Sequence, residues 1–260
     1  MAILDMPADL WWQALGLEAD EAPAALILEG TWWRERATRA RLSLLQDVRE
    51  LPFPEMYHGR VGGVPVAYCC AYGAARAVEP AHVFAQMGAP LLIQIGTCGT
   101  LDRAAGTGLV ILPGSCAARD GISPLYGAGA KLETDAHWRA RAEAALCDLG
   151  RETRAAYHLT WPSLFAQSDA MCAAWADEGL LSVDMETAAV LAVARRFGAG
   201  AVAMLTVWDA LPHGRTFLDP LPEADAARLA ASDRAVFEAA LTLAQEAAAE
   251  EAEAARNRQR

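Results

Sequence analysis

Two carboxylates flank a methionine at Asp184-Met185-Glu186, directly before an apolar stretch, residues 187–197, that is typical of a packed helix. Burying even half of a carboxylate costs on the order of several kcal/mol unless the group has partners. At least one of the two acids is therefore expected to face a cleft and to meet hydroxyl groups or a cation there. Acids in the first turn of a helix are also stabilised by the helix dipole without any ligand. The segment alone leaves both interpretations open.

Three further segments combine glycines, hydroxyls and charges at the ends of predicted strands. Gly96-Thr97-Cys98-Gly99 follows residues 91–95, and as a tight turn it would offer backbone N–H groups and a hydroxyl to an anion. Gly30 follows residues 24–28, and Arg34, one helical turn later, has the forked geometry that holds an oxyanion. Taken alone, each pattern is more often explained without a ligand, the first as a simple glycine turn and the second as a solvated helix arginine.

The fourth strand end is Trp208-Asp209, after residues 201–207. In α/β folds, ligands bind outside the carboxyl ends of the strands. Since all four predicted strand ends carry glycines or acids, we expect them to meet at one site.

The chain alternates short apolar strands with helical stretches over most of its length. Predicted strands cover residues 24–28, 64–70, 91–95, 109–112, 157–160, 181–183 and 201–207. Predicted helices cover residues 33–45, 77–87, 137–149, 170–178, 187–197 and 223–256. This order predicts an α/β fold with a central mixed sheet flanked by helices on both faces. We expect a single domain over residues 1–260, with a C-terminal helix at about 223–256 and a frayed tail.

Composition limits the classes of function. The 260 residues are 54% hydrophobic, enough for a large core, and carry a formal net charge of -11, which argues against a nucleic-acid partner. The six cysteines form no C-x-x-C pair, so reduced thiols are expected rather than a zinc site or a disulfide framework. The first ten residues do not resemble a signal peptide, and no apolar run is long enough to span a membrane. These features predict a cytoplasmic protein.

Residues 91–102 (LLIQIGTCGTLD) and 183–194 (VDMETAAVLAVA) resemble the two signature stretches of the nucleoside phosphorylase family, in its hexameric bacterial purine and uridine branch. Residues 205–209 (LTVWD) are similar to the strand that ends in the family's catalytic acid, and the likeness extends over residues 24–211. The resemblance implies phosphate-dependent cleavage of an N-glycosidic bond, with nucleoside and phosphate as the small-molecule partners. It implies no metal and no cofactor beyond phosphate as co-substrate. It also implies a homo-oligomer based on a dimer, with dimer and hexamer both left open.

The resemblance also implies roles for individual residues. The phosphate would be held by Gly30, Arg34, Thr97 and an arginine lent by a neighbouring subunit, Arg49. Phe165 would lie against the base, Met185 under the ribose with Asp184 beside it, and Glu186, if ionised, would accept the ribose hydroxyls. Asp209 would protonate the departing purine.

The chain departs from the family pattern at several positions. Gln94 stands where an arginine is usual on the strand before the glycine segment, so phosphate should bind more weakly. Arg76 is a candidate replacement, although an ordinary surface arginine is equally expected. Thr31-Trp32 replaces the usual Asp-Pro, and Trp208 replaces a small serine, where an indole would narrow the base pocket or point into the core. Arg215 is a candidate to orient Asp209.

These observations leave several functions open. The first is a phosphorylase of purine nucleosides; purine is favoured because the paired Gln and Arg of the uridine branch are missing after Phe165. The second is a hydrolase of the same fold, favoured by Gln94 and by the missing Asp-Pro. The third is a nucleoside-binding protein without turnover, against which Asp209 argues. A Rossmann-type cofactor enzyme is disfavoured because no G-x-G-x-x-G follows the first strand.

Overall fold

The computed structural model describes residues 3–258 of the chain. Its strands are β1 (Ala25–Gly30), β2 (Gln46–Glu50), β3 (Met56–Val61), β4 (Val64–Cys70), β5 (Leu91–Thr100), β6 (Val110–Ala118), β7 (Lys131–Glu133), β8 (Thr153–Thr160), β9 (Ser182–Asp184) and β10 (Gly200–Ala210). Its α-helices are α1 (Ala8–Leu15), α2 (Arg34–Leu42), α3 (Ala74–Gln86), α4 (Ala136–Asp148), α5 (Asp169–Asp177), α6 (Thr187–Phe197) and α7 (Glu223–Arg258). Short 3-10 helices lie at Ile3–Asp5, Ala19–Glu21, Ser123–Tyr126 and Leu211–His213.

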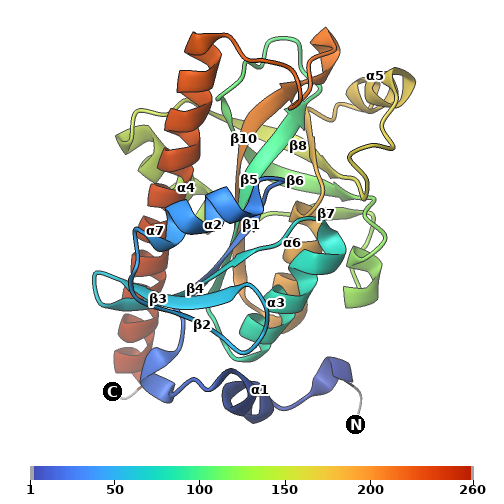
Figure 1. Cartoon of the computed structure of the whole chain (residues 1–260). Helices are drawn as coiled ribbons and strands as arrows, with labels where there is room; N and C mark the ends of the chain where they lie inside the picture. Colours follow the sequence, from blue (N-terminus) through green and yellow to red (C-terminus); the bar gives the residue numbers. More distant parts are fainter. Residues whose placement is uncertain (1–2, 259–260) are drawn as a thin grey trace.

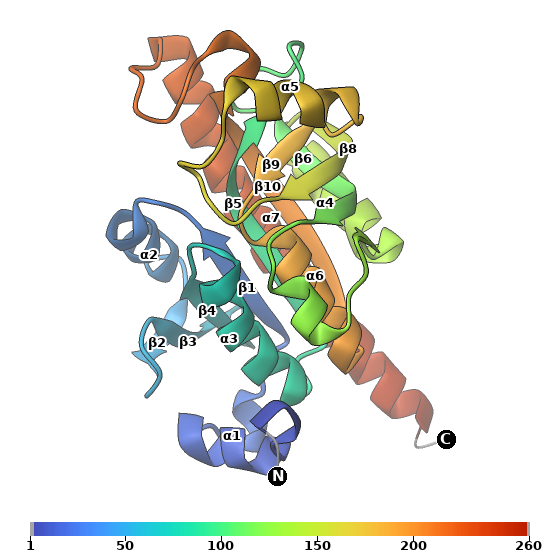
Figure 2. The same cartoon turned by 90° about the vertical axis from the view of Figure 1, so that its right-hand side faces the viewer.

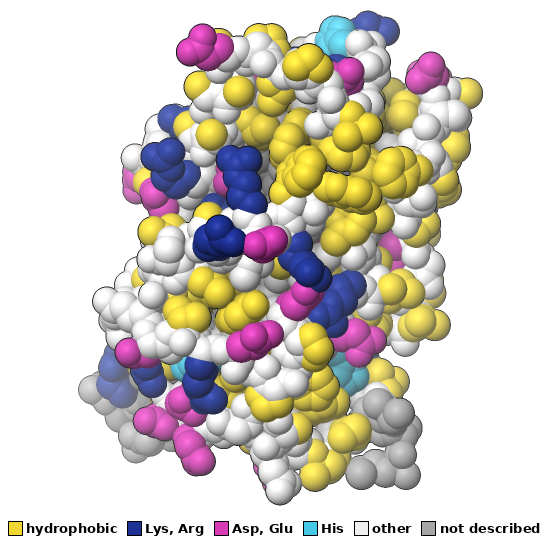
Figure 3. All heavy atoms as spheres, viewed as in Figure 1, with side chains coloured by type: hydrophobic (Ala, Val, Ile, Leu, Met, Phe, Trp, Pro, Cys, Tyr) yellow, Lys and Arg dark blue, Asp and Glu magenta, His cyan; other side chains and the backbone are white. Residues whose placement is uncertain are grey.

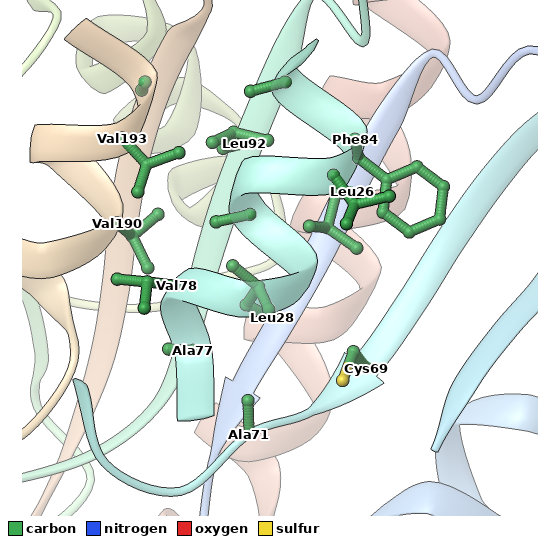
Figure 4. Close-up of a cluster of buried hydrophobic side chains, with 14 of the residues drawn as sticks. Leu26, Leu28, Cys69, Ala71, Ala77, Val78, Phe84, Leu92, Val190 and Val193 are labelled. Carbon is green, nitrogen blue, oxygen red and sulfur yellow. The ribbon is translucent and has the colours of Figure 1, made fainter. Parts of the chain in front are cut away.

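The strands form one mixed sheet in the order β10-β6-β8-β9-β5-β1-β4-β3-β2, with β7 paired to β6. Side chains that alternate along β1 separate the two faces of this sheet. Leu26 and Leu28 pack in one buried cluster with α3 and α6, as Figure 4 shows. Ala25 and Ile27 pack in a second cluster with α4 and α7. Figure 1 shows the long α7 along one side of the sheet and α3 and α6 on the other. The predicted α/β fold with helices on both faces is confirmed.

One end of the sheet closes on itself. β5 pairs with β10 in parallel, and β10, β6, β8 and β9 lead back to β5, which β9 meets in antiparallel orientation. Buried side chains of β5, β6, β8 and β10 fill the inside of this closed part, among them Cys98, Ile111 and Val207. The view in Figure 2 shows these strands stacked under α5. The closure brings the ends of β5, β9 and β10 together.

The predicted tight turn at residues 96–99 is wrong, because β5 continues unbroken from Leu91 to Thr100. Gly96 instead allows β5 to approach β1 closely. A Cβ atom at Gly96 would lie 2.3 Å from the Gly30 carbonyl oxygen, and Gly96 has a φ of 146°. Glycine is the residue that permits both the approach and this backbone angle.

Other elements match the predicted pattern or add to it. The glycine pair at residues 62–63 joins β3 to β4 as an antiparallel hairpin, and the helix predicted at 223–256 extends to Arg258. The outermost end of the predicted frayed tail, residues 259–260, lies outside the described residues. The predicted helices and strands did not include α1, β2, β3 or β7. None of the helices formed by residues 3–258 combines the length and the apolar character needed to cross a membrane.

Candidate active site

The four strand ends selected from the sequence line one cleft. Gly30 of β1, Thr97 of β5, Glu186 after β9 and Asp209 of β10 all border it. The space between the cleft walls that no protein atom fills is about 620 Å³, part of it open to solvent.

The cleft exists because β5 changes its neighbour at this point. β1 pairs with β5 only as far as Gly30 opposite Gly96, and β9 begins to pair at Gly99 opposite Val183. Between these two pairings Thr97 and Cys98 lack a partner strand on that side, and both line the cleft. A free stretch of strand edge presents backbone groups to a ligand.

Gly30 is needed for a close approach to Glu186. A Cβ atom at Gly30 would lie 2.6 Å from the Glu186 carboxyl carbon, so a larger residue would displace the acid. The Glu186 carboxyl can therefore lie against the end of β1 because Gly30 has no side chain.

Glu186 is buried, with 3% of its surface exposed. One carboxyl oxygen accepts a 2.5 Å hydrogen bond from the Gly73 N–H, and the other accepts one of 3.2 Å from the Met185 N–H. Burial and the nearby Asp184 carboxylate raise the pKa of Glu186 to about 8, against the opposing effect of these two N–H groups. The sequence analysis assumed an ionised Glu186. With a pKa of about 8, the carboxyl is mostly protonated at neutral pH.

Asp184 has a different environment, although it lies two residues away. Its oxygens accept hydrogen bonds from the Thr160 hydroxyl (2.8 Å), the Thr187 N–H (2.9 Å) and the Thr187 hydroxyl (2.6 Å). The His158 Nε2 atom lies 2.9 Å from it. Burial acts to raise the pKa of Asp184, but His158 and these hydrogen bonds hold it below its usual value. Asp184 thus joins β8, β9 and the start of α6.

Asp209 lies in β10 where the pairing register with β5 shifts between Val207 and Asp209. Its Oδ1 atom is buried and has no hydrogen-bond partner among the described residues. Burial raises the pKa of Asp209 to about 6, while the Phe217 backbone and the charge of Arg215 act to lower it. A half-buried acid whose pKa is raised to about 6 and that borders an open cleft is suited to proton transfer.

A sequence model of the protein family described as the phosphorylase superfamily matches residues 36–254. The chain belongs to this superfamily. The resemblance to nucleoside phosphorylases noted from residues 91–102 and 183–194 is confirmed.

Individual members of the phosphorylase superfamily show the extent of the likeness. The chain is 31% identical over 137 residues to a DeoD-type purine nucleoside phosphorylase of Alkaliphilus metalliredigens. The aligned residues make up 51% of this chain and 58% of that relative. It is 27% identical over 139 residues to one of Caldanaerobacter subterraneus subsp. tengcongensis, covering 49% and 60%. The chain thus spans less than two thirds of the length of these curated relatives. A uridine phosphorylase from Vibrio fischeri ES114, complexed with 6-hydroxy-1-naphthoic acid, has a TM-score of 0.74 at 18% identity, covering 87% of this chain and 93% of that one. This last likeness shows a shared fold.

The arginines expected from the superfamily pattern lie away from the cleft. Arg34 forms an ion pair with Glu55, and Arg49 binds Glu21 at 2.8 Å. Arg76 donates a 2.8 Å hydrogen bond to the Pro54 carbonyl. Of the side chains that line the cleft within residues 3–258, none belongs to lysine, arginine or histidine.

Gln94 and Arg215 also differ from their expected positions. Gln94 is buried in β5 and donates to the Ile95 carbonyl at 3.0 Å, so it does not face the cleft. Arg215 bonds to Asp225 at 3.0 Å and to the Thr107 hydroxyl. Its guanidinium makes no hydrogen bond to Asp209 in the described structure, and it acts on that acid through its charge.

Of the aromatic side chains described next, at the mouth of the cleft, Phe165 was selected as a site residue from the sequence and the other three were not. Trp32 contacts Tyr72, Phe165 and Phe217, with ring centroids 5.6, 5.9 and 5.8 Å apart. We call these four residues the aromatic rim. The adjacent Trp32-Trp33 pair directly after a strand end was the available signal. Trp208 lines the cleft, and its indole Nε1 atom is buried without a hydrogen-bond partner among the described residues.

Proposed function

We propose that the chain cleaves the N-glycosidic bond of a purine nucleoside with inorganic phosphate, giving free base and pentose 1-phosphate. The observation that carries this proposal is that Glu186, after β9, and Asp209, in β10, border the same cleft, because β9 and β10 both pair with β5. Glu186 binds the ribose hydroxyls above Met185, and Asp209 meets the base, against which Phe165 lies. Two acids with different tasks in one cleft fit a reaction that separates a sugar from a basic heterocycle.

The two carboxyl groups have matched chemical tasks. As the bond from the sugar C1′ atom to the base nitrogen breaks, a phosphate oxygen forms the new bond to C1′. The proton of the Asp209 carboxyl moves to a ring nitrogen of the departing purine, and the carboxylate regains a proton from solvent. A pKa of about 6 leaves part of Asp209 protonated at neutral pH. General acid catalysis of this kind contributes about 10²–10⁴ in rate.

Phosphate is held by the free edge of β5, where the Thr97 hydroxyl and the backbone beside Gly30 border the cleft. Since no cationic side chain of the described residues lines the cleft, the positive charge comes from a second copy of the chain. Arg49 is the proposed donor. It lies on β2, an edge strand that pairs on one side only, with β3. This arrangement makes the protein a homo-oligomer of at least two chains.

Co-expression of two inactive variants tests the shared site. Arg49→Ala and Asp209→Asn chains are each expected to be nearly inactive alone. Mixed oligomers contain sites with an intact Asp209 and a neighbour's intact Arg49. Random dimer assembly should restore about a quarter of the wild-type activity per chain. Activity no greater than the sum of the two variants would exclude a donated Arg49.

Hydrolysis by the same cleft is the second candidate, favoured by the absence of a cation among the described side chains that line it. The discriminating measurement is base release from a panel of purine and pyrimidine nucleosides, with and without phosphate. Phosphorolysis predicts release that depends on phosphate and yields pentose 1-phosphate. Equal release in phosphate-free buffer, with free pentose as the product, would assign a nucleosidase.

A further inference from the structure

Trp208 and Asp209 are neighbours in β10, and both border the cleft. Side chains that follow one another in a regular strand point to opposite faces of the sheet. The pairing of β10 with β5 shifts between Val207 and Asp209, so Trp208 has no partner residue on β5. An extra residue of this kind is a β-bulge, which redirects side chains and is frequent beside active sites. The bulge therefore presents an indole and a carboxyl to the same ligand.

Three buried polar atoms around this bulge have no hydrogen-bond partner among the described residues: Trp208 Nε1, Asp209 Oδ1 and Arg215 Nε. Arg215 is held close to the bulge, because its backbone N–H donates to the Ala210 carbonyl at 3.3 Å. Buried polar groups nearly always have partners in folded proteins, so unpaired ones beside a cleft indicate a ligand.

The surroundings of these three atoms are apolar. Phe217 of the aromatic rim lines the same cleft. Figure 3 shows hydrophobic side chains gathered over the upper part of the molecule, where Figure 1 places the ends of β5 and β10. An unpaired polar atom costs more free energy in apolar surroundings than in contact with water. A ligand that pairs these atoms is therefore favoured over one that leaves them unpaired.

The three atoms include more donors than acceptors. Trp208 Nε1 and Arg215 Nε each carry one N–H, and only the Asp209 oxygen can accept. Whichever donor takes that oxygen, one N–H remains, so the ligand must bring an acceptor. Along one edge, a purine with an oxygen on C6 carries two acceptors, O6 and N7. A 6-aminopurine has N7 and an amino donor on that edge, which would add a third donor.

We propose that Trp208 selects 6-oxopurine nucleosides, with its indole N–H donating to the oxygen on C6 of the base. The inference rests on the proposed function, because the proton that Asp209 gives to the ring atom N7 orients the base. Arg215 Nε then donates to the remaining Asp209 oxygen, so that all three atoms have partners. Since Nε1 is buried, the indole turns toward the base as the base enters. An amino group on C6 would face the indole N–H without a hydrogen bond, which disfavours 6-aminopurines.

The test measures kcat/KM with saturating phosphate for inosine, adenosine and purine riboside, which carry oxygen, an amino group and hydrogen on C6, respectively. The wild type should favour inosine over adenosine by about 100-fold. Trp208→Phe keeps an aromatic ring but removes the N–H, so it should lower kcat/KM for inosine by about tenfold. The values for adenosine and purine riboside should stay within about threefold, because neither C6 substituent accepts from the indole. Trp12→Phe, at a half-buried position on α1 outside the cleft, is the matched control.

Binding measurements separate a failure of this inference from a failure of the proposed function. Calorimetric titration with hypoxanthine and adenine measures recognition of the base without turnover. Tighter binding of hypoxanthine that Trp208→Phe abolishes, with no base released from any nucleoside, would contradict the proposed function and retain the role of Trp208. Base release with the same inosine-to-adenosine ratio in wild type and Trp208→Phe would overturn the inference alone. Equal wild-type affinity for the two bases would also overturn it, even if the variant failed to fold.

Discussion

Asp209→Asn is expected to lower kcat for purine nucleosides by about 10²–10⁴-fold and to change KM little. Asparagine has the same shape but cannot supply the proton that the departing base takes. Since the Asp209 Oδ1 atom makes no hydrogen bond within the described structure, the amide replaces it without breaking a contact. The measurement is steady-state base release at pH 6–8, with unfolding monitored to confirm an intact fold.

The Asp209→Asn variant also tests the pH dependence of kcat/KM. The acid works in its protonated form, and the pKa of Asp209 in the folded chain is about 6. Wild-type kcat/KM should therefore fall as pH rises above about 6, and the residual activity of Asp209→Asn should lack this decline. Asp148→Asn, an exposed substitution at the end of α4, should behave as wild type. An Asp209→Asn enzyme with wild-type turnover would remove this residue as the proton donor.

Sequence patterns gave the correct strand ends because each depends on neighbouring residues. The acids at 184–186, the glycine at 30 and the acid at 209 follow apolar runs that are readable without any tertiary contact. The same reasoning failed at Gly96, where glycines suggest a turn. There the glycine allows β5 to pass the Gly30 carbonyl, a contact between residues 66 positions apart in the chain.

The spacing of Asp184 and Glu186 did not predict that the pKa of the first carboxyl is lowered and that of the second is raised. Asp184 is satisfied by Thr160 and His158, which lie on β8, and Glu186 is bonded by Gly73, 113 residues away. The sequence did not show either that, among the described residues, no lysine, arginine or histidine lines the cleft. Whether an arginine faces a ligand depends on its folded partners, such as Glu55 for Arg34 and Glu21 for Arg49.

Glu186→Gln is expected to stabilise the fold at alkaline pH while it impairs catalysis. The pKa of Glu186 is raised from 4.5 to about 8 in the folded chain. Between these values the folded protein holds a proton that the unfolded chain has released, so the contribution of Glu186 to wild-type stability is fully present below pH 4.5 and is lost as pH rises to about 8. The loss is on the order of a few kcal/mol. Glutamine is neutral at every pH in this range, so the Glu186→Gln variant does not lose this stability.

Thermal or denaturant unfolding between pH 5 and pH 9 measures this difference. The stability of Glu186→Gln relative to wild type should rise steadily from pH 5 and level off above about pH 8, whereas Glu143→Gln, at an exposed position on α4, should show no such slope. In activity assays, Glu186→Gln should lose nucleoside affinity and kcat together, because glutamine offers only one acceptor oxygen to the ribose hydroxyls. A flat stability difference would mean that Asp184 and burial do not hold a proton on Glu186. An unchanged KM would place the sugar elsewhere in the cleft.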